Sequence, residues 1–305
     1  MIKTEHLSKD YRSTKAVDDI SFDIETGKVT GFLGPNGAGK STTMRLMLGL
    51  DNGSGSTKYD GKQLHEYSCP SSMVGILLEA KAFHPTRSAR NHLKVLATAG
   101  NVSLKRVDEV LDIVGLKDVA KKKPGKFSLG MSQRLGIAAA ILSKPKYLIL
   151  DEPANGLDPE GIVWMREFLK SYADDGNGVF VSSHLLSEMA QMADNVIVIG
   201  KGKLIANTSI KSLLSSNTKS TVFVRSGNLT KLQNILKEKS LQTEMSKDGL
   251  EVFGVKTDEV GKLAHMSGLS VLELTTRNAS LEDVFLELTE GKEEYQARNP
   301  KGTKS

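Results

Sequence analysis

The fold is decided by one stretch of the sequence, Gly34-Pro35-Asn36-Gly37-Ala38-Gly39-Lys40-Ser41-Thr42. It matches the phosphate-binding loop pattern, which is a glycine, four further residues and then Gly-Lys-Ser. Glycines have no Cβ atom, so successive backbone N–H groups can turn inward around phosphate oxygens. The stretch therefore predicts a cradle for the phosphates of a nucleotide.

The residues on either side of the loop support this interpretation. The apolar run 29–33 predicts a strand that enters the loop, and 43–48 predicts an amphipathic helix that leaves it. The positive end of that helix dipole would face the phosphates. We expect Lys40 to reach the β- and γ-phosphates and the hydroxyl of Ser41 to hold Mg²⁺.

A second chemical element follows a buried strand. Residues 147–150 are apolar and lead directly into Asp151 and Glu152. Ligands bind beyond the carboxyl ends of strands in open α/β sheets. We therefore expect Asp151 to complete the Mg²⁺ shell, through water, and Glu152 to act as general base or to orient the attacking water. Taken alone, such an acid pair also fits a helix cap.

Strands and helical patterns alternate through the first two thirds of the chain, which predicts a largely parallel sheet with helical layers. Helical spacing dominates residues 87–142. A small polar cluster at 215–218 predicts a domain boundary. Beyond it the order β-α-β-β-α-β over 221–274 predicts a ferredoxin-like domain. A last helix is expected to begin at Ser280, and a polar tail follows from Gly291.

Taken in order, these motifs resemble those of the ATP-binding subunits of ABC transporters, over residues 1–211. Residues 127–134 are similar to the family's signature sequence, Leu-Ser-Gly-Gly-Gln. Ser128 and Gly130 match it, whereas Leu129 and Met131 depart from it. The resemblance implies that this segment contacts the γ-phosphate of ATP held by the opposite subunit. Ser128 also fits an ordinary helix N-cap.

Three further residues match family positions. Residues 155–158 resemble the D-loop, so Asp158 would meet the partner subunit and the nucleotide, although it could equally cap the helix that starts at Pro159. His184 matches the switch histidine that contacts the γ-phosphate. Tyr11 resembles the aromatic residue that stacks on adenine, and a surface or core tyrosine is the other interpretation.

One position departs from the family in a way that affects the metal. Where a glutamine is usual, the predicted strand 73–78 ends in Glu79, whose carboxylate can also ligate Mg²⁺ but adds negative charge near the phosphates. Residues 79–85 and 279–286 are similar to those of bacterial exporters for antibiotics and lantibiotics. The resemblance thus implies export of a drug, antibiotic, peptide or lipid.

The resemblance also implies an α/β fold class: a P-loop ATPase fold with a mainly parallel sheet, an antiparallel N-terminal β part and a helical subdomain. A small C-terminal α+β domain of ferredoxin-like type would follow. We expect the ATP-binding domain over 1–215, with its helical subdomain at about 87–143. The accessory domain would cover 219–290, and 291–305 would be a flexible tail.

Composition limits the remaining choices. The chain has 305 residues, a net charge of +5 and one cysteine, so intramolecular disulfides are excluded. No apolar run approaches the roughly 20 residues of a membrane span. The lysine run 121–123 fits a solvated helix end, and no nucleic-acid partner is expected because few aromatic residues accompany it. We expect a soluble intracellular protein.

Our hypothesis is an ATPase in which two copies close around two ATP molecules and drive a separate membrane permease. It would then lie on the cytoplasmic face of the cell membrane. The alternative is a soluble ABC-type ATPase that acts on ribosomes or DNA. The single phosphate loop and the absence of a long heptad run in the sequence favour the transporter.

Overall fold

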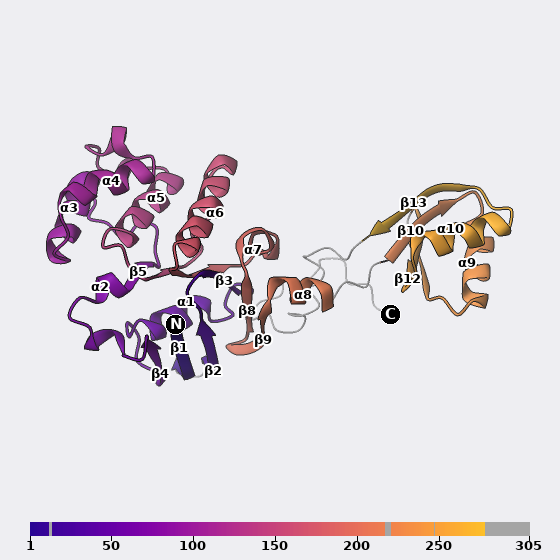
Figure 1. The fold of residues 1–305 in the computed structure, drawn as a ribbon, viewed down its shortest axis with the longest axis horizontal. Coiled ribbons are helices and arrows are strands. Elements are labelled where there is room, and N and C mark those ends of the chain that lie inside the picture. The colour runs from indigo at the N-terminus through magenta and orange to yellow at the C-terminus, as the bar shows by residue number, and fades with distance from the viewer. Residues whose placement is uncertain (12–13, 217–220, 247, 278–305) are drawn as a thin grey trace. The chain divides into compact units, whose positions relative to one another are not determined.

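The computed structural model describes residues 1–11, 14–216, 221–246 and 248–277. Within them the chain divides into two compact units, Met1–Ile210 and a second that begins at Lys211 (Figure 1). The helix predicted from Ser280 and the tail predicted over 291–305 lie outside the described residues. The domain limits expected at 215, 219 and 290 stay predictions.

The first unit is built on a six-stranded sheet whose neighbouring strands are parallel, except for the antiparallel last pair. In spatial order its strands are β5 (Val74–Leu77), β6 (Tyr147–Leu150), β7 (Gly178–Ser183), β3 (Lys28–Leu33), β8 (Asn195–Gly200) and β9 (Lys203–Ser209). Every residue of β6 and β7 is buried. Strands buried on both faces form continuous apolar runs, which is why the sequence pattern located them. The predicted mainly parallel sheet is confirmed.

An antiparallel sheet of three strands forms the N-terminal part, in the order β2 (Thr14–Ile24), β1 (Ile2–Tyr11) and β4 (Ser54–Tyr59). The pattern of apolar residues alone indicated only β2. Register shifts interrupt the pairing of β1 at three places between Thr4 and Asp10, so its side chains do not alternate regularly. Its presence agrees with the antiparallel part that the family resemblance implied.

Aromatic side chains join the two sheets in one core. The ring of Phe22 on β2 lies 5.9 Å from that of Phe32 on β3 and 5.7 Å from that of Phe180 on β7, centroid to centroid. Phe32 and Phe180 are themselves 5.1 Å apart. All three side chains are buried. Burial of apolar area of this kind is the main favourable term in folding, so the strands that carry the phosphate loop sit on a rigid base.

Helices account for most of the remaining first unit, and the helical pattern predicted over 87–142 is confirmed. That segment holds α3 (Ala89–Ala99), α4 (Lys105–Ile113) and α5 (Leu129–Ala140), with short 3-10 turns at Lys117–Val119 and Pro124–Lys126. The other helices of this unit are α1 (Lys40–Met47), α2 (Pro70–Met73), α6 (Pro159–Asp174) and α7 (Leu186–Met192), with a further 3-10 turn at Leu64–Glu66. Helix α8 (Ile210–Ser216) begins at Ile210 and continues into the second unit. The polar cluster 215–218, predicted as a domain boundary, overlaps the end of α8, because Ser215 and Ser216 belong to that helix and residues 217 and 218 lie outside the described residues.

Helix α6 presents a row of aromatic side chains along one edge. Trp164, Phe168 and Tyr172 follow each other at intervals of four residues, and their ring centroids are 5.6 and 5.9 Å apart. The guanidinium of Arg134 on α5 lies 5.3 Å from the Trp164 ring. Such cation–π contact links α5 to α6 beyond simple packing.

The second unit follows the predicted β-α-β-β-α-β order. Its elements are β10 (Thr221–Ser226), α9 (Leu229–Glu238), β11 (Thr243–Ser246), β12 (Gly249–Phe253), α10 (Thr257–Met266) and β13 (Val271–Arg277). The strands lie in the order β11-β12-β10-β13, and each neighbouring pair is antiparallel. This is the ferredoxin-like arrangement, with its own buried core.

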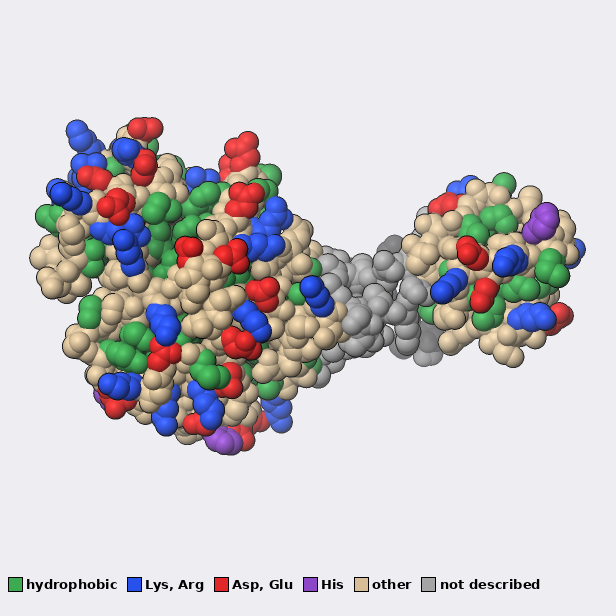
Figure 2. Space-filling model, in the orientation of Figure 1, with side chains coloured by type: hydrophobic (Ala, Val, Ile, Leu, Met, Phe, Trp, Pro, Cys, Tyr) green, Lys and Arg blue, Asp and Glu red, His purple; other side chains and the backbone are tan. Residues whose placement is uncertain are grey.

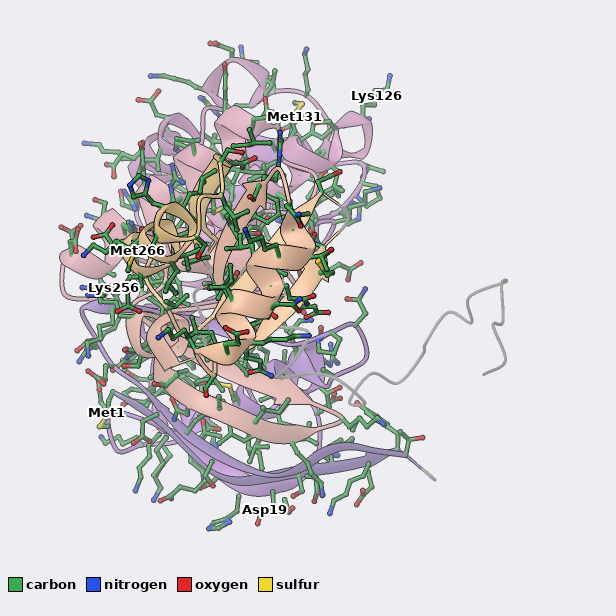
Figure 3. All side chains as sticks on the ribbon, turned by 90° about the vertical axis from the view of Figure 1, so that its right-hand side faces the viewer. Met1, Asp19, Lys126, Met131, Lys256 and Met266 are labelled. Atoms are coloured by element: carbon green, nitrogen blue, oxygen red, sulfur yellow. The ribbon has the colours of Figure 1, made fainter. Side chains whose placement is uncertain are left out.

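Charged side chains of both signs are interspersed over the face of the first unit that Figure 2 shows. Lys121, Lys122 and Lys123 are exposed, and the Lys126 side chain points outward from the surface (Figure 3). No helix among the described residues combines the length and the apolar character that a bilayer crossing requires.

Strand β5 has a glycine where helix α5 approaches it most closely. A Cβ on Gly75 would lie 2.1 Å from the backbone oxygen of Ala140 and 2.8 Å from Pro145. We predict that Gly75→Ala lowers the free energy of unfolding by about 1–3 kcal/mol, because backbone must shift to relieve the overlap. Urea unfolding measures this value. Gly125→Ala is the control, since its nearest neighbour is 3.5 Å away, and an equal loss in both variants would contradict the packing argument.

Candidate functional site

The phosphate loop connects β3 to α1, and its geometry depends on glycines. Gly37 and Gly39 have φ values of 81° and 103°, which L side chains rarely adopt. A Cβ on Gly39 would lie 2.4 Å from the carbonyl oxygen of Ala16, and one on Gly34 would lie 2.5 Å from that of Ile199. The loop is therefore pressed against β2 and β8, which leaves its inner side open.

A cavity of about 690 Å³ lies on that inner side. It is lined by most of the predicted site, namely Tyr11, the loop residues 35–42, Asp151 and Glu152. Lys15 and Lys201 also line it, and sequence reasoning had not selected them. Parallel strands β3 and β6 end at the same edge of the sheet, so residues more than a hundred positions apart meet here. The volume is ample for a nucleotide.

The ammonium group of Lys40 is buried at the floor of this cavity. Its Nζ donates to the carbonyl oxygen of Gly34 at 2.7 Å and lies 3.5 Å from Oε1 of Glu152. Burial lowers the pKa of Lys40, and the negative charge of Glu152 opposes that effect. A desolvated cation in the first turn of a helix is a strong point of attraction for an anion.

Asp151 lies between two hydroxyl groups. Ser41 donates to its Oδ2 and Ser182 to its Oδ1, each at 2.5 Å. The hydroxyl and carboxylate oxygens of Ser41 and Asp151 thus face each other across the mouth of the loop. Oxygen ligands of this kind suit a hard divalent cation, so the pair fits Mg²⁺.

Glu152 is held in an unusual backbone conformation, with φ of 46°. A non-glycine residue in this left-handed region is uncommon, and such residues concentrate at functional sites. Its N–H donates to the hydroxyl of Ser182 at 2.8 Å, and its Oε2 lies 2.9 Å from Nδ1 of His184. The structure therefore brings His184 to the carboxylate of Glu152, although His184 does not line the cavity itself.

Tyr11 is at the outer rim of the cavity. Its ring is exposed, while its hydroxyl donates to Oδ2 of Asp51 at 2.9 Å. Arg45 also bonds Asp51 at 3.0 Å, and the ammonium of Lys9 lies 4.8 Å from the ring centroid. The hydroxyl of Tyr11 is thus held by Asp51 while its ring is exposed beside the ammonium of Lys9. Sequence reasoning had not noticed Asp51.

Glu79 does not line the first cavity, whereas the other two predicted metal ligands, Ser41 and Asp151, do. It is exposed and lines a second cavity of about 620 Å³, to which Ser41 and Asp151 also contribute. Within the described parts of the chain, no group of three or more His, Cys, Asp or Glu side chains is arranged to hold a metal ion.

The signature segment lies away from the cavity, because neither Ser128 nor Gly130 lines it. Ser128 is the N-cap of α5, and its hydroxyl accepts from the N–H of Met131 at 3.2 Å. A Cβ on Gly130 would lie 2.8 Å from the carbonyl oxygen of Gly156. The segment packs directly on the loop that follows Glu152, and its exposed start is free to meet another molecule.

Asp158 is also a cap, on α6, where its Oδ1 accepts from the N–H of Gly161 at 3.0 Å. The cap interpretations of Ser128 and Asp158 are therefore both confirmed. Asp158 is exposed and does not line the cavity. Because Asp158 is exposed, its side chain could contact a partner molecule while it caps α6.

Comparison with known proteins identifies the class. A family model described as ABC transporter matches residues 17–155, and one described as a domain of unknown function matches residues 220–282. A solved structure of the ATP-binding subunit of an ABC transporter has 26% identity and a TM-score of 0.65, over 71% of this chain and 92% of that one. A post-hydrolysis dimer of the cassette MJ0796 with ADP and Pi shares the fold, with 22% identity and a TM-score of 0.63 over 69% of this chain and 99% of that one.

One of the curated relatives matches nearly the whole chain, and another matches about two thirds of it. The bacitracin transport ATP-binding protein BcrA of Bacillus licheniformis is 40% identical over 95% of this chain and 98% of its own length. The lantibiotic transport ATP-binding protein SrtF of Streptococcus pyogenes is 39% identical over 67% of this chain and 89% of its own. The chain belongs to the family of ABC transporter ATP-binding proteins, and it is an ATPase subunit with a P-loop α/β fold.

Ser182 is the residue of this site that was hardest to predict from the sequence. It ends β7 with its side chain completely buried, and it joins Asp151 to the N–H of Glu152. The only signal was its position, at the carboxyl end of a buried strand beside β6. Polar residues at such strand ends merit attention for that reason.

We predict that Ser182→Ala lowers the free energy of unfolding by about 1–3 kcal/mol, because the N–H of Glu152 is left without its acceptor in a partly buried place. Urea unfolding measures the change. Ser21→Ala is the matched control. Its hydroxyl also accepts from a backbone N–H, that of His6, but at an exposed site where water can replace it. Equal losses would mean that the burial of Ser182 has no energetic consequence.

Proposed function

We propose that this chain hydrolyses ATP to drive export of an antibiotic peptide, acting on a separate membrane permease from the cytoplasmic face of the cell membrane. The observation that carries the proposal is the meeting of Lys40, Ser41, Asp151 and Glu152 around one cavity. These are the groups that phosphoryl transfer to water requires: a cation, metal-binding oxygens and a base.

Phosphate binding would begin with the backbone. Residues 36, 37 and 39–41 line the cavity and would offer backbone N–H groups, whereas the N–H of Ala38 already donates to the carbonyl oxygen of Pro35 at 3.1 Å. The N-terminus of α1 would add the positive end of its dipole. The Nζ of Lys40 would exchange its bond to the Gly34 carbonyl for the β- and γ-phosphate oxygens. Because this cation is already desolvated, its attraction for phosphate is stronger than in water.

Ser41 and Asp151 are the residues that would hold Mg²⁺, and Glu79 could join them only from the neighbouring cavity. When bound, the ion supplies positive charge that neutralises the phosphate oxygens. Ser182 keeps the carboxylate of Asp151 turned toward Ser41. The hydrogen bond from Ser182 would therefore orient one of the two side chains that hold the metal.

Glu152 would accept a proton from the attacking water. Its carboxylate lies between the ammonium of Lys40 and the ring of His184, at 3.5 and 2.9 Å. His184 would orient the carboxylate and contact the γ-phosphate. The positive φ of Glu152 turns its side chain back toward the loop, so backbone strain serves to position the base.

Two copies of the chain would complete each ATP site. Ser128, Gly130 and Asp158 lie outside the cavity that holds Lys40, and Ser128 and Asp158 are exposed. A second copy, arranged head to tail, would present these groups to the γ-phosphate. The nucleotide would then join the two copies, and hydrolysis would release them and move the attached permease.

The cargo is argued from the relatives. BcrA is named as an ATP-binding protein of bacitracin transport, and SrtF as one of lantibiotic transport. We therefore assign a peptide antibiotic as the substrate class. The membrane subunit would supply the binding pocket for it.

The proposal is tested by Glu152→Gln. We expect ATP turnover to fall by about a hundredfold or more, since the amide cannot take a proton. Nucleotide affinity should persist, and ATP should hold the variant as a dimer in light scattering, because the bridge between copies is not cleaved. Cells that carry the permease should lose protection against the peptide with this variant.

Glu160→Gln is the matched control, because Glu160 is an exposed residue of the first turn of α6 and lies outside the cavity. It should behave as the parent protein. Unchanged turnover in Glu152→Gln would refute the role of this carboxylate. A monomer at saturating ATP would refute the shared site.

The base of the nucleotide should rest on the Tyr11 ring. We predict that Tyr11→Ala weakens ATP binding by about ten- to a hundredfold, because base–aromatic stacking contributes roughly 1–3 kcal/mol. Tyr11→Phe keeps the ring and loses only the bond to Asp51, so its affinity should change by much less. Titration with a fluorescent ATP analogue measures both. Equal affinity in the Ala variant and the parent would place the base elsewhere.

A further inference from the structure

Helix α5 contains a buried amide that reaches the loop of the catalytic carboxylate. The side chain of Gln133 is 5% exposed, and its Nε2 donates to the carbonyl oxygens of Glu152 at 3.2 Å and Asn155 at 3.3 Å. Each bond spans about twenty residues of sequence. Gln133 therefore attaches the helix to the main chain of the loop, and not to another side chain.

The backbone that Gln133 holds is the strained one. The carbonyl of Glu152 receives a second bond, from the N–H of Asn155 at 3.2 Å, and the N–H of Glu152 donates to Ser182. The left-handed conformation of Glu152 is thus fixed from both ends of the residue. Strained conformations persist where the surroundings determine them in this way.

The carbonyl oxygens that face Gln133 require a hydrogen-bond donor at this position. Both atoms that face the amide nitrogen are carbonyl oxygens, and Oε1 of Gln133 is buried with no hydrogen-bond partner within the described residues. Only an amide orientation with Nε2 toward the loop satisfies those carbonyls. A methionine would fill the same space but donate nothing, and this difference separates positioning from packing.

The same helix carries the signature segment at its start. Ser128 caps α5, and Gln133 lies in the second turn of the helix. Close packing joins the two elements a second time, because a Cβ on Gly156 would lie 2.3 Å from the Leu129 side chain. The start of α5 and the loop that follows Glu152 are therefore in direct contact.

We propose that Gln133 is a positioning residue that couples the two ATP sites of the dimer. This inference rests on the proposed function, in which Ser128 faces the ATP of the partner while Glu152 faces the ATP of its own chain. Gln133 connects these two groups within one chain. Contact of Ser128 with one nucleotide then sets the backbone of the carboxylate that acts on the other.

The experiment compares Gln133→Met with Gln133→Ala in the full chain. Loss of two hydrogen bonds should lower kcat by about tenfold in both variants, since the misplaced carboxylate reacts less often. KM and the affinity for a fluorescent ATP analogue should stay within about twofold of the parent, because no group that touches nucleotide has changed. Gln191→Met removes an exposed amide on α7 and should leave kcat unchanged.

If Gln133 only fills space, Met restores kcat to the parent value while Ala does not, and that result overturns the inference. A double variant gives the second arm. Ser128→Ala combined with Gln133→Met should lower kcat no further than the worse single change, because both act on one path. Multiplied losses would overturn the coupling. If the parent protein hydrolyses no ATP, the proposed function fails. If the parent hydrolyses ATP and Gln133→Met has the same kcat, only this inference fails.

Discussion

The buried ammonium of Lys40 is the constraint on which the rest of the site depends. A desolvated charge is costly unless carbonyl oxygens and opposite charges surround it, and here Gly34 and Glu152 do so. That arrangement requires the end of β3, the start of α1 and the end of β6 to meet. The parallel sheet, the glycine-dependent loop and the aromatic core beneath it all keep these three ends together.

The sequence predicted the parts of the site that are local. The phosphate loop occupies consecutive residues, so its motif, flanking strand and helix could be read directly, and Asp151 and Glu152 followed from a fully buried strand. The ferredoxin-like unit was also predictable, because its order of elements restricts the topology. Strand β1 was not, since its register shifts remove the alternation on which strand patterns depend.

The contacts that hold the site could not be predicted in the same way. Ser182 and Gln133 act through hydrogen bonds to the main chain, and for Gln133 these bonds reach residues about twenty positions away. Ser182 belongs to no motif that the sequence analysis selected, and Gln133 lies within the signature segment but was not selected as a site residue. Tyr11 was found, but its tether to Asp51 joins residues 40 positions apart. Hydrogen bonds between elements depend on atomic positions to within a fraction of an ångström, which periodicity does not encode.

The aromatic row on α6 has an experimental consequence. Trp164 is the single tryptophan of the chain, and its indole lies against Arg134, the residue next to Gln133 on α5. Indole emission responds to the electric field of a nearby cation. The protein therefore carries an intrinsic optical probe between the two helices, so that rearrangement of α5 against α6 can be followed by fluorescence without attaching a dye.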